Sequence, residues 1–237
     1  MIEKKLHTVK GEDKEQNHQW IFKTIDNNQN TKYPFVVIDN WFTPQEEIAV
    51  WKELDYISSI DAGQLDRAEN TIVARDSNGN PKGKSYRWYY SNFFTDFSLK
   101  YSTIYNTHHK IYQKNFREQI EKCTPYSRSF FTTNRSNILI SYYEDNDYYD
   151  SHFDTFLWTS CIWMVKEPRK FSGGDFIFDE SNTEIKLKNN RAVFFPCCYL
   201  HTSTPIKFNS PTHNFGDGKY TITSFYYTIP KSEPKDD

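Results

Sequence analysis

The second half of the chain is a series of short apolar and aromatic runs separated by turn residues, and this pattern constrains the fold most. Short runs bounded by turn residues are typical of strands, and many of them in succession favour a sandwich or jelly roll. Aromatic residues make up 18% of the chain and favour the pleated surface of a sheet. The runs are Asn137–Tyr143, Thr159–Val165, Asp175–Phe178, Glu184–Leu187, Ala192–Phe195, Tyr199–Thr202 and Tyr220–Thr228.

One strand and one helix are expected early in the chain. The apolar run Phe35–Ile38 predicts a short strand. Thr43 is expected to cap the following helix, with Pro44 at its first position and Glu46 closing a capping box. The apolar face of this helix is expected to consist of Ile48, Val50, Trp51 and Leu54.

The other N-terminal segments are assigned by polarity and periodicity. Residues 1–32 are polar, and Asn27–Asn30 marks a turn or loose segment. The polar stretch Gly63–Ser85 predicts a long loop and a candidate lid, and Phe97–Cys123 predicts the longest helix. We expect one domain over residues 1–237. In it, N-terminal helices and the lid region (1–125) buttress a mainly β core (126–228), which a polar tail (229–237) follows.

Composition excludes several classes of function. Lys and Arg number 29 and Asp and Glu 31, a net charge of −2, which disfavours binding to nucleic acid or to an anionic membrane surface. No apolar run approaches the roughly 20 residues of a membrane span, and residues 1–23 do not resemble a secretory signal. Four cysteines are too few for a disulfide scaffold. We therefore expect a cytoplasmic protein, in the host cytoplasm if the source is a virus.

Three residues form a candidate metal site. His152 and Asp154 stand two positions apart, and on a strand both side chains would point to the same face. Such a pair alone is more often a hydrogen-bonded surface pair than a metal site. His201 follows 47 residues after Asp154, on another expected β segment. Two histidines and one carboxylate on a β-roll match the facial triad that binds Fe(II) in non-haem oxygenases.

Several segments then resemble the prolyl 4-hydroxylase-like Fe(II)/2-oxoglutarate-dependent dioxygenases, in particular their phage and bacterial members. That family shows a Tyr-Glu-x-Gly-x-x-Tyr-x-x-His-x-Asp pattern, which Tyr143–Asp154 resembles. Four further segments are similar to family motifs: Phe35–Asn40, Phe171–Phe176, Val193–Pro196 with His201, and Lys219–Thr223. The resemblance covers residues 135–228 well and 33–55 loosely.

The resemblance implies a double-stranded β-helix (jelly roll) and a hydroxylase that converts 2-oxoglutarate to succinate. It implies iron ligation by His152, Asp154 and His201, with O2 as co-reactant and ascorbate as a candidate accessory reductant. It also implies that Lys219 and Tyr143 hold the distal carboxylate of 2-oxoglutarate. Thr221 shares a strand face with Lys219 and is a further candidate for this site.

The chain departs from the family pattern at three places. Asn146 replaces a Gly, and Asn tolerates the left-handed backbone of a tight turn. Phe176 stands where the family often has a Thr that contacts the cosubstrate. The gap between His201 and Lys219 is long, and Lys207 is therefore a rival for the carboxylate anchor.

The substrate is less constrained than the chemistry. A peptidyl proline is expected from the resemblance, with a free small molecule as the alternative and nucleic acid disfavoured by the charge. Arg75, Arg87 and Trp88 lie in or beside the candidate lid and are candidate substrate contacts. A catalytically silent jelly roll that binds a metal and a partner is a different class of function. A complete triad together with a basic anchor argues against it.

The remaining histidines, cysteines and tryptophans are interpreted as structural. His108 and His109 are expected on a solvated helix face, and His213 in a mobile loop. Cys197 and Cys198 are expected to be buried thiols. Trp158 and Trp163 are expected in the core or in the lining of the barrel.

Overall fold

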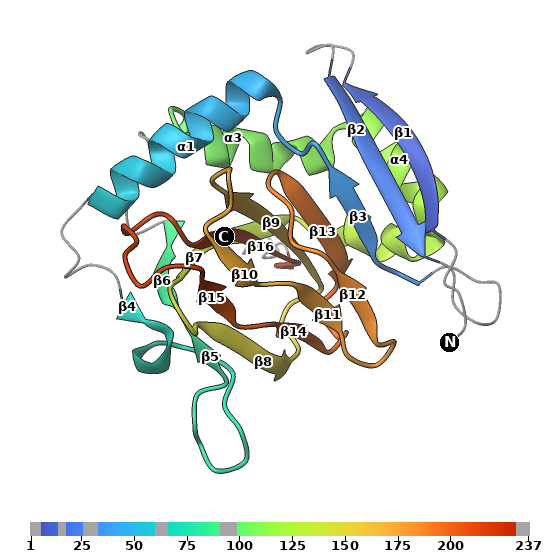
Figure 1. Cartoon of the computed structure of the whole chain (residues 1–237). Helices are drawn as coiled ribbons and strands as arrows, with labels where there is room; N and C mark the ends of the chain where they lie inside the picture. The colour runs from blue at the N-terminus through green and yellow to red at the C-terminus, as the bar shows by residue number, and fades with distance from the viewer. Residues whose placement is uncertain (1–5, 14–17, 26–32, 60–65, 91–98, 231–237) are drawn as a thin grey trace, which may run out of the picture.

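The computed structural model describes residues 6–13, 18–25, 33–59, 66–90 and 99–230 (Figure 1). The predicted turn at Asn27–Asn30, the start of the expected lid and of the long helix, and residues 231–237 of the expected tail lie outside these ranges. The α-helices are α1 (Pro44–Ser59), α3 (Thr103–His108) and α4 (Lys114–Cys123), and the 3₁₀ helices are η2 (Ala68–Asn70), η4 (His109–Tyr112) and η5 (Pro125–Thr132). The strands are β1 (Leu6–Asp13), β2 (His18–Ile25), β3 (Val36–Asp39), β4 (Asp66–Arg67), β5 (Gly83–Lys84), β6 (Tyr86–Tyr89), β7 (Arg135–Tyr143), β8 (Tyr148–His152), β9 (Trp158–Val165), β10 (Phe171–Gly173), β11 (Phe176–Phe178), β12 (Thr183–Ile185), β13 (Arg191–Pro196), β14 (His201–Ser203), β15 (Ile206–Phe208) and β16 (Lys219–Tyr227).

Two antiparallel sheets form the roll, as the sequence predicts. The larger sheet has the strand order β1-β2-β3-β13-β9-β16-β7-β6-β4, and the smaller has the order β12-β11-β14-β8-β5. The chain passes repeatedly from the large sheet to the small one: β7 is followed by β8, β9 by β10 and then β11, and β13 by β14. This alternation is the winding of a double-stranded β-helix. Strands β10 and β15 form a separate two-stranded ribbon.

Alternate residues of the large-sheet strands face two different apolar clusters, as the period of two requires. On β9, Ile162 and Met164 belong to the cluster under the helices, whereas Cys161, Trp163 and Val165 belong to the cluster inside the roll. The same division holds on the neighbouring strands β13 and β3. The large sheet is therefore covered by helices on one face and by the small sheet on the other.

The predicted capping box at the start of α1 is confirmed. Thr43 N donates to a Glu46 carboxylate oxygen at 2.8 Å, and Glu46 N donates to Thr43 Oγ1 at 3.2 Å. The buried face of the helix differs from the predicted one, because Ile48 is 60% exposed while Ile57 is buried. Val50 and Leu54 pack on the large sheet as expected. Among the described residues, no helix is long and apolar enough to cross a membrane.

The predicted long helix up to Cys123 is not continuous. Within its described part, the chain forms α3, η4 and α4 in succession, and α4 begins after Gln113, whose backbone is extended. This break lets Ile104, Ile111 and Phe116 all reach the same apolar cluster. The polar N-terminal segment, for which no strand was predicted, forms strands. It pairs as the hairpin β1-β2, since Trp20 and Phe22 of β2 are buried in that cluster.

The candidate lid is tied to the small sheet. Strand β5 pairs with β8, Lys82 O accepts from Asp150 N at 2.8 Å, and Ala74 N donates to the Tyr149 hydroxyl at 3.1 Å. The turn around Gly79 projects away from both sheets at the bottom of Figure 1. Residues 66–85 therefore form an anchored extension of the roll and not a structureless loop.

Candidate active site

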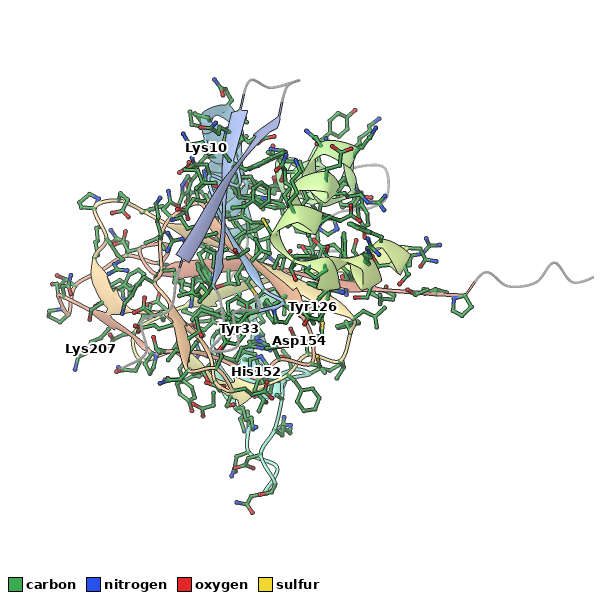
Figure 2. All side chains as sticks on the ribbon, turned by 90° about the vertical axis from the view of Figure 1, so that its right-hand side faces the viewer. Lys10, Tyr33, Tyr126, His152, Asp154 and Lys207 are labelled. Atoms are coloured by element: carbon green, nitrogen blue, oxygen red, sulfur yellow. The ribbon has the colours of Figure 1, made fainter. Side chains whose placement is uncertain are left out.

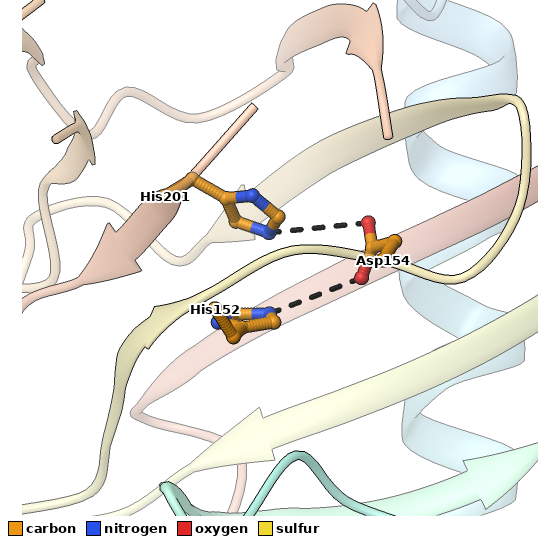
Figure 3. Close-up of side chains that lie close together, drawn as sticks. All are labelled: His152, Asp154 and His201. Carbon is orange, nitrogen blue, oxygen red and sulfur yellow. Dashed lines mark ion pairs between the residues drawn. The ribbon is translucent and has the colours of Figure 1, made fainter. Parts of the chain in front are cut away.

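His152, Asp154 and His201 come together inside the roll (Figure 3). The Nε2 atom of His152 lies 3.9 Å from Oδ1 of Asp154, and the Nε2 atom of His201 lies 3.9 Å from Oδ2 of the same carboxylate. The potential ligand atoms of the three residues all lie within 4.8 Å of one another. Two imidazole nitrogens and one carboxylate thus face a common point.

Strand pairing explains the position of the two imidazoles. β14 pairs antiparallel with β8, and His201 lies directly opposite His152. The predicted position of Asp154 on the same strand is wrong, because β8 ends at His152. Asp154 is held instead by a backbone hydrogen bond from its N to Cys197 O at 3.1 Å, and by the Thr159 hydroxyl, which donates to Oδ2 at 2.6 Å.

In both histidines, the Nδ1 atom that points away from Asp154 hydrogen-bonds to a backbone carbonyl. Nδ1 of His152 lies 2.8 Å from Asp150 O, and Nδ1 of His201 lies 2.9 Å from Tyr199 O. These carbonyls can only accept, so each ring carries its proton on Nδ1 and directs the lone pair of Nε2 inward. Burial, helped by His201, lowers the pKa of His152 to about 2. Both features suit neutral imidazoles that bind a metal.

The donor set fits Fe(II). Three protein ligands from one side, of the 2-His-1-carboxylate type, leave the remaining positions of an octahedral ion open. The Thr159 hydroxyl and the two carbonyls supply the outer contacts that orient ligands in metal sites. The residues present would therefore hold the metal that the sequence predicts.

Lys219 is buried at the first position of β16, with 1% of its surface exposed. Its ammonium donates to Gly174 O at 3.0 Å and to the Ser203 hydroxyl at 2.5 Å, and lies 4.5 Å from the centre of the Tyr143 ring. Burial lowers the pKa of Lys219 to about 7. Among the described residues, no carboxylate pairs with this cation.

A cavity of about 400 Å³ connects the triad to Lys219. Thr221 lies beside Lys219 on the cavity face of β16, and its buried hydroxyl has no hydrogen-bond partner among the described atoms. The strand register places two further residues in line with Thr221. Thr221 pairs with Ser141 of β7, and Ser141 pairs with Arg87 of β6. Thr221, Ser141 and Arg87 all line the cavity.

Three other candidates from the sequence, Lys207, Arg75 and Trp88, lie outside this cavity. Lys207 is exposed on β15 and lies at the periphery of the molecule, away from His152 and Asp154 (Figure 2). Arg75 is exposed and donates to Gly79 O within its own turn. Trp88 faces the helix-covered cluster, because it alternates with Arg87 on β6.

Sequence reasoning missed Tyr149 and Ser203 as cavity residues. Tyr149 stacks on His152 with ring centres 3.5 Å apart. Phe176, which the sequence marks as a departure from the resembled pattern, stacks on His201 at 5.2 Å. Ser203 stands two positions after His201 and contacts Lys219. Because side chains alternate along a strand, the position of His201 would have identified Ser203 as a cavity residue. The sequence carried no clear sign of strand β6 or of how it pairs with β7.

Two residues interpreted as structural, His108 and Cys198, differ from expectation. His108 is buried and not solvated, with Nδ1 2.9 Å from Ser224 Oγ and its ring stacked on Tyr226. Cys198 is exposed, whereas Cys197 is buried as predicted. Trp158 and Trp163 are buried as predicted, and Trp163 lines the cavity.

Fold and site together define a double-stranded β-helix with a His-Asp-His cluster at one end of an internal cavity. No protein-family model and no curated protein sequence matches the chain. Among solved structures, a Pseudomonas putida prolyl-4-hydroxylase is similar with a TM-score of 0.53 at 12% identity, over 84% of this chain and 94% of that one. This likeness confirms the predicted fold.

Two further structures match at lower scores. One is the viral collagen prolyl hydroxylase of Paramecium bursaria Chlorella virus 1, with a TM-score of 0.49 and 15% identity over 84% of this chain and 91% of that one. The other is a 2OG-Fe(II) oxygenase-family oxidoreductase from Burkholderia pseudomallei, with a TM-score of 0.47 and 11% identity over 82% and 85%.

Proposed function

We propose that this protein is an Fe(II)- and 2-oxoglutarate-dependent dioxygenase that hydroxylates a C–H bond. The observation that carries the proposal is that one cavity holds three candidate metal ligands and a buried lysine to which the described residues supply no carboxylate partner. Bound iron would supply the activation of O2, coupled to the conversion of 2-oxoglutarate to succinate. The rest of the chemistry depends on how the chain holds the reactants.

The roles of the cavity residues follow from their positions. His152, Asp154 and His201 would hold the metal, and Thr159 fixes the Asp154 carboxylate. Lys219 would bind the distal carboxylate of 2-oxoglutarate, because a buried ammonium gains most from a charged acceptor. The free hydroxyl of Thr221 and the ring of Tyr143 would complete this end of the cavity.

The substrate we propose is a peptidyl proline. The support is the motif resemblance and the fold shared with a bacterial prolyl-4-hydroxylase. Ile72, Val73 and Ala74 of the anchored extension line the cavity, so a peptide could dock beneath them. The specific test is mass spectrometry of a Pro-rich peptide after incubation with enzyme, Fe(II), 2-oxoglutarate and O2. Loss of 2-oxoglutarate without gain of an oxygen atom on the peptide would reject this substrate.

The proposed chemistry is tested by replacing the ligands one at a time. His152→Ala and His201→Ala should each abolish succinate formation while the far-UV circular dichroism spectrum is unchanged. His213→Ala is the matched control, since His213 pairs with Glu144 and does not line the cavity. Succinate formation at the wild-type rate in either ligand variant would show that the triad is not the metal site. The catalytically silent alternative predicts instead that the wild-type protein itself forms no succinate.

A further inference from the structure

Arg87 is a buried cation to which the described part of the chain supplies no counterion. Only 6% of its surface is exposed, and its Nε atom has no hydrogen-bond partner among the described atoms. Among the described residues, no carboxylate lies within ion-pair distance of its guanidinium. Two other arginines of the large sheet are paired differently: Arg67 binds Asp147 through two nitrogens, and Arg191 binds Asp39 in the same way. A buried, permanently charged group that lacks a partner is costly for a fold.

The position of Arg87 places this charge beside the metal ligands. Its guanidinium carbon lies 4.5 Å from the centre of the Tyr149 ring, and the same ring stacks on His152. The guanidinium is one of the charges that hold down the pKa of His152. Lys219 lies two strands away, on β16. Arg87 and Lys219 therefore line one cavity from different strands of the large sheet.

If the proposed function is correct, the loaded cavity lacks one negative charge. The two negative charges of 2-oxoglutarate balance the two positive charges of Fe(II), and Asp154 balances Lys219. The other ionisable groups that line the cavity are histidines, tyrosines and a cysteine, and Asp154 is the one carboxylate among the described residues that line it. The charge of Arg87 remains uncompensated when metal and cosubstrate are bound.

The mouth of the cavity is apolar. Ile72 is 87% exposed and Phe153 is 60% exposed, although both line the cavity. Phe156 also lines it and stacks on Phe225 with ring centres 4.8 Å apart. Exposed apolar side chains around a concave site mark a binding surface. The ligand that fits this mouth has an apolar body.

We propose that Arg87 binds a carboxylate of the substrate, so that the substrate class is an apolar molecule or segment that carries an acidic group. A guanidinium suits this role because its planar fork binds a carboxylate with two hydrogen bonds. The carboxylate can belong to a free acid, or to an acidic residue next to the oxidised position in a peptide.

Two matched pairs of probes test the proposal and distinguish these sources. N-acetylproline and N-acetylprolinamide differ only in the charge of a free acid. Acetyl-Pro-Glu-amide and acetyl-Pro-Gln-amide differ in the same way at a peptide side chain. Dissociation constants are measured by calorimetry on the full chain with Fe(II) and 2-oxoglutarate, without oxygen. In at least one pair the acid should bind about tenfold tighter than its amide, or more tightly still.

Variants assign this preference to Arg87. Arg87→Gln should abolish it, Arg87→Lys should retain part of it, and the control Arg75→Gln should leave it intact. Arg87→Lys keeps a positive charge in the cavity. Partial retention of the preference in this variant would show that the loss in Arg87→Gln reflects the missing charge and not misfolding. The proposal is overturned if neither acid binds tighter than its amide, or if the preference survives in Arg87→Gln.

The cosubstrate provides the remaining control. Arg87→Gln should leave the affinity for 2-oxoglutarate within about threefold of wild type, since Lys219 is the anchor. An affinity loss as large as that of Lys219→Ala would mean that Arg87 binds the cosubstrate, which contradicts the proposal. If the wild-type protein does not bind 2-oxoglutarate at all, the proposed function itself has failed. Binding of 2-oxoglutarate without acid discrimination refutes only the substrate inference.

Discussion

Individual side chains in the cavity differ mainly in whether a neighbour already satisfies their charge. Asp154 has a hydroxyl and two imidazoles around it, whereas the hydrogen-bond and ring contacts that the described residues make to the charged groups of Lys219 and Arg87 come from neutral groups. The energetic cost of burying these two cations is the clearest indication that the cavity takes anionic ligands.

Replacement of Lys219 tests the first of these ligands. Removing one partner of a buried charge pair costs about 2–5 kcal/mol, so Lys219→Ala should weaken 2-oxoglutarate binding by roughly 30-fold to several thousand-fold. Lys207→Ala is the matched control and should have little effect, because Lys207 is exposed outside the cavity. The measurement is the Michaelis constant for 2-oxoglutarate in both variants. A severe defect in Lys207→Ala and a mild one in Lys219→Ala would show that Lys207, and not Lys219, binds the distal carboxylate.

The protonation of Lys219 predicts a pH dependence. Burial lowers its pKa to about 7, so the free enzyme loses the cation as the pH rises above 7. The carboxylates of 2-oxoglutarate remain ionised over this range, and Cys161 beside the lysine stays neutral because burial raises its pKa to about 12. Affinity for 2-oxoglutarate should therefore fall by up to about tenfold per pH unit above 7.

Lys219→Arg supplies the control for this dependence, since a guanidinium does not lose its proton in this range. Its affinity for 2-oxoglutarate should be lower than that of wild type at pH 7 but flat from about pH 7 to 9. An equally flat profile in the wild-type protein would show that the lysine stays charged without a ligand.

The sequence predicts these residues to different degrees. The triad and Lys219 lie in short segments with family-like spacing, and strand alternation then orients Thr221 with Lys219. Arg87 and Trp88 are adjacent, and the sequence could not tell which faces the cavity. That choice depends on the register of β6 against β7, where Arg87 pairs with Ser141. Register between strands distant in sequence is set by tertiary packing, which one sequence does not reveal.

A buried histidine helps to hold the helices against the large sheet. His108 at the end of α3 lies 2.9 Å from Ser224 Oγ of β16 and 2.6 Å from Ser136 Oγ of β7. Burial lowers the pKa of His108 to about 3. The prediction of a solvated helix face failed because the break before α4 turns this segment onto the sheet.

This histidine should make the fold sensitive to acid. Between about pH 6.5 and 3 the unfolded chain binds a proton at this position that the folded chain excludes. Stability therefore falls as the pH is lowered through this window, by up to about 1.4 kcal/mol per pH unit. His108→Gln, which has no titrating group, should show a shallower loss of stability in urea unfolding at pH 7, 5 and 4. Equal slopes in the variant and the wild type would contradict the buried neutral histidine.

The predicted strands of the roll are largely correct, and the errors occur where local pattern competes with tertiary contact. β8, β10 and β15 are short and carry too few apolar residues to stand out. In β2 the buried Trp20 and Phe22 alternate with more exposed residues, and both pack in the apolar cluster under the helices. The interruption of the long helix is likewise set by the surface that it covers.

For the whole molecule, binding of metal and cosubstrate should stabilise the fold. Both would bind between the two sheets, with ligands on β8 and β14 and the anchor on β16. Because ligands that bind only the folded state raise its stability, Fe(II) with 2-oxoglutarate under anaerobic conditions should raise the melting temperature by several degrees. His201→Ala should lose most of this rise. An equal rise in the variant would show that the ligands bind elsewhere.

The most direct test of the central claim is the anaerobic absorption spectrum of the protein with Fe(II) and 2-oxoglutarate. Chelation of iron by the keto acid in the site of His152, Asp154 and His201 predicts a visible charge-transfer band. The band should require both additions and should be absent from His201→Ala. A wild-type protein that shows no band with both present, or a band of equal strength in the variant, would contradict the account.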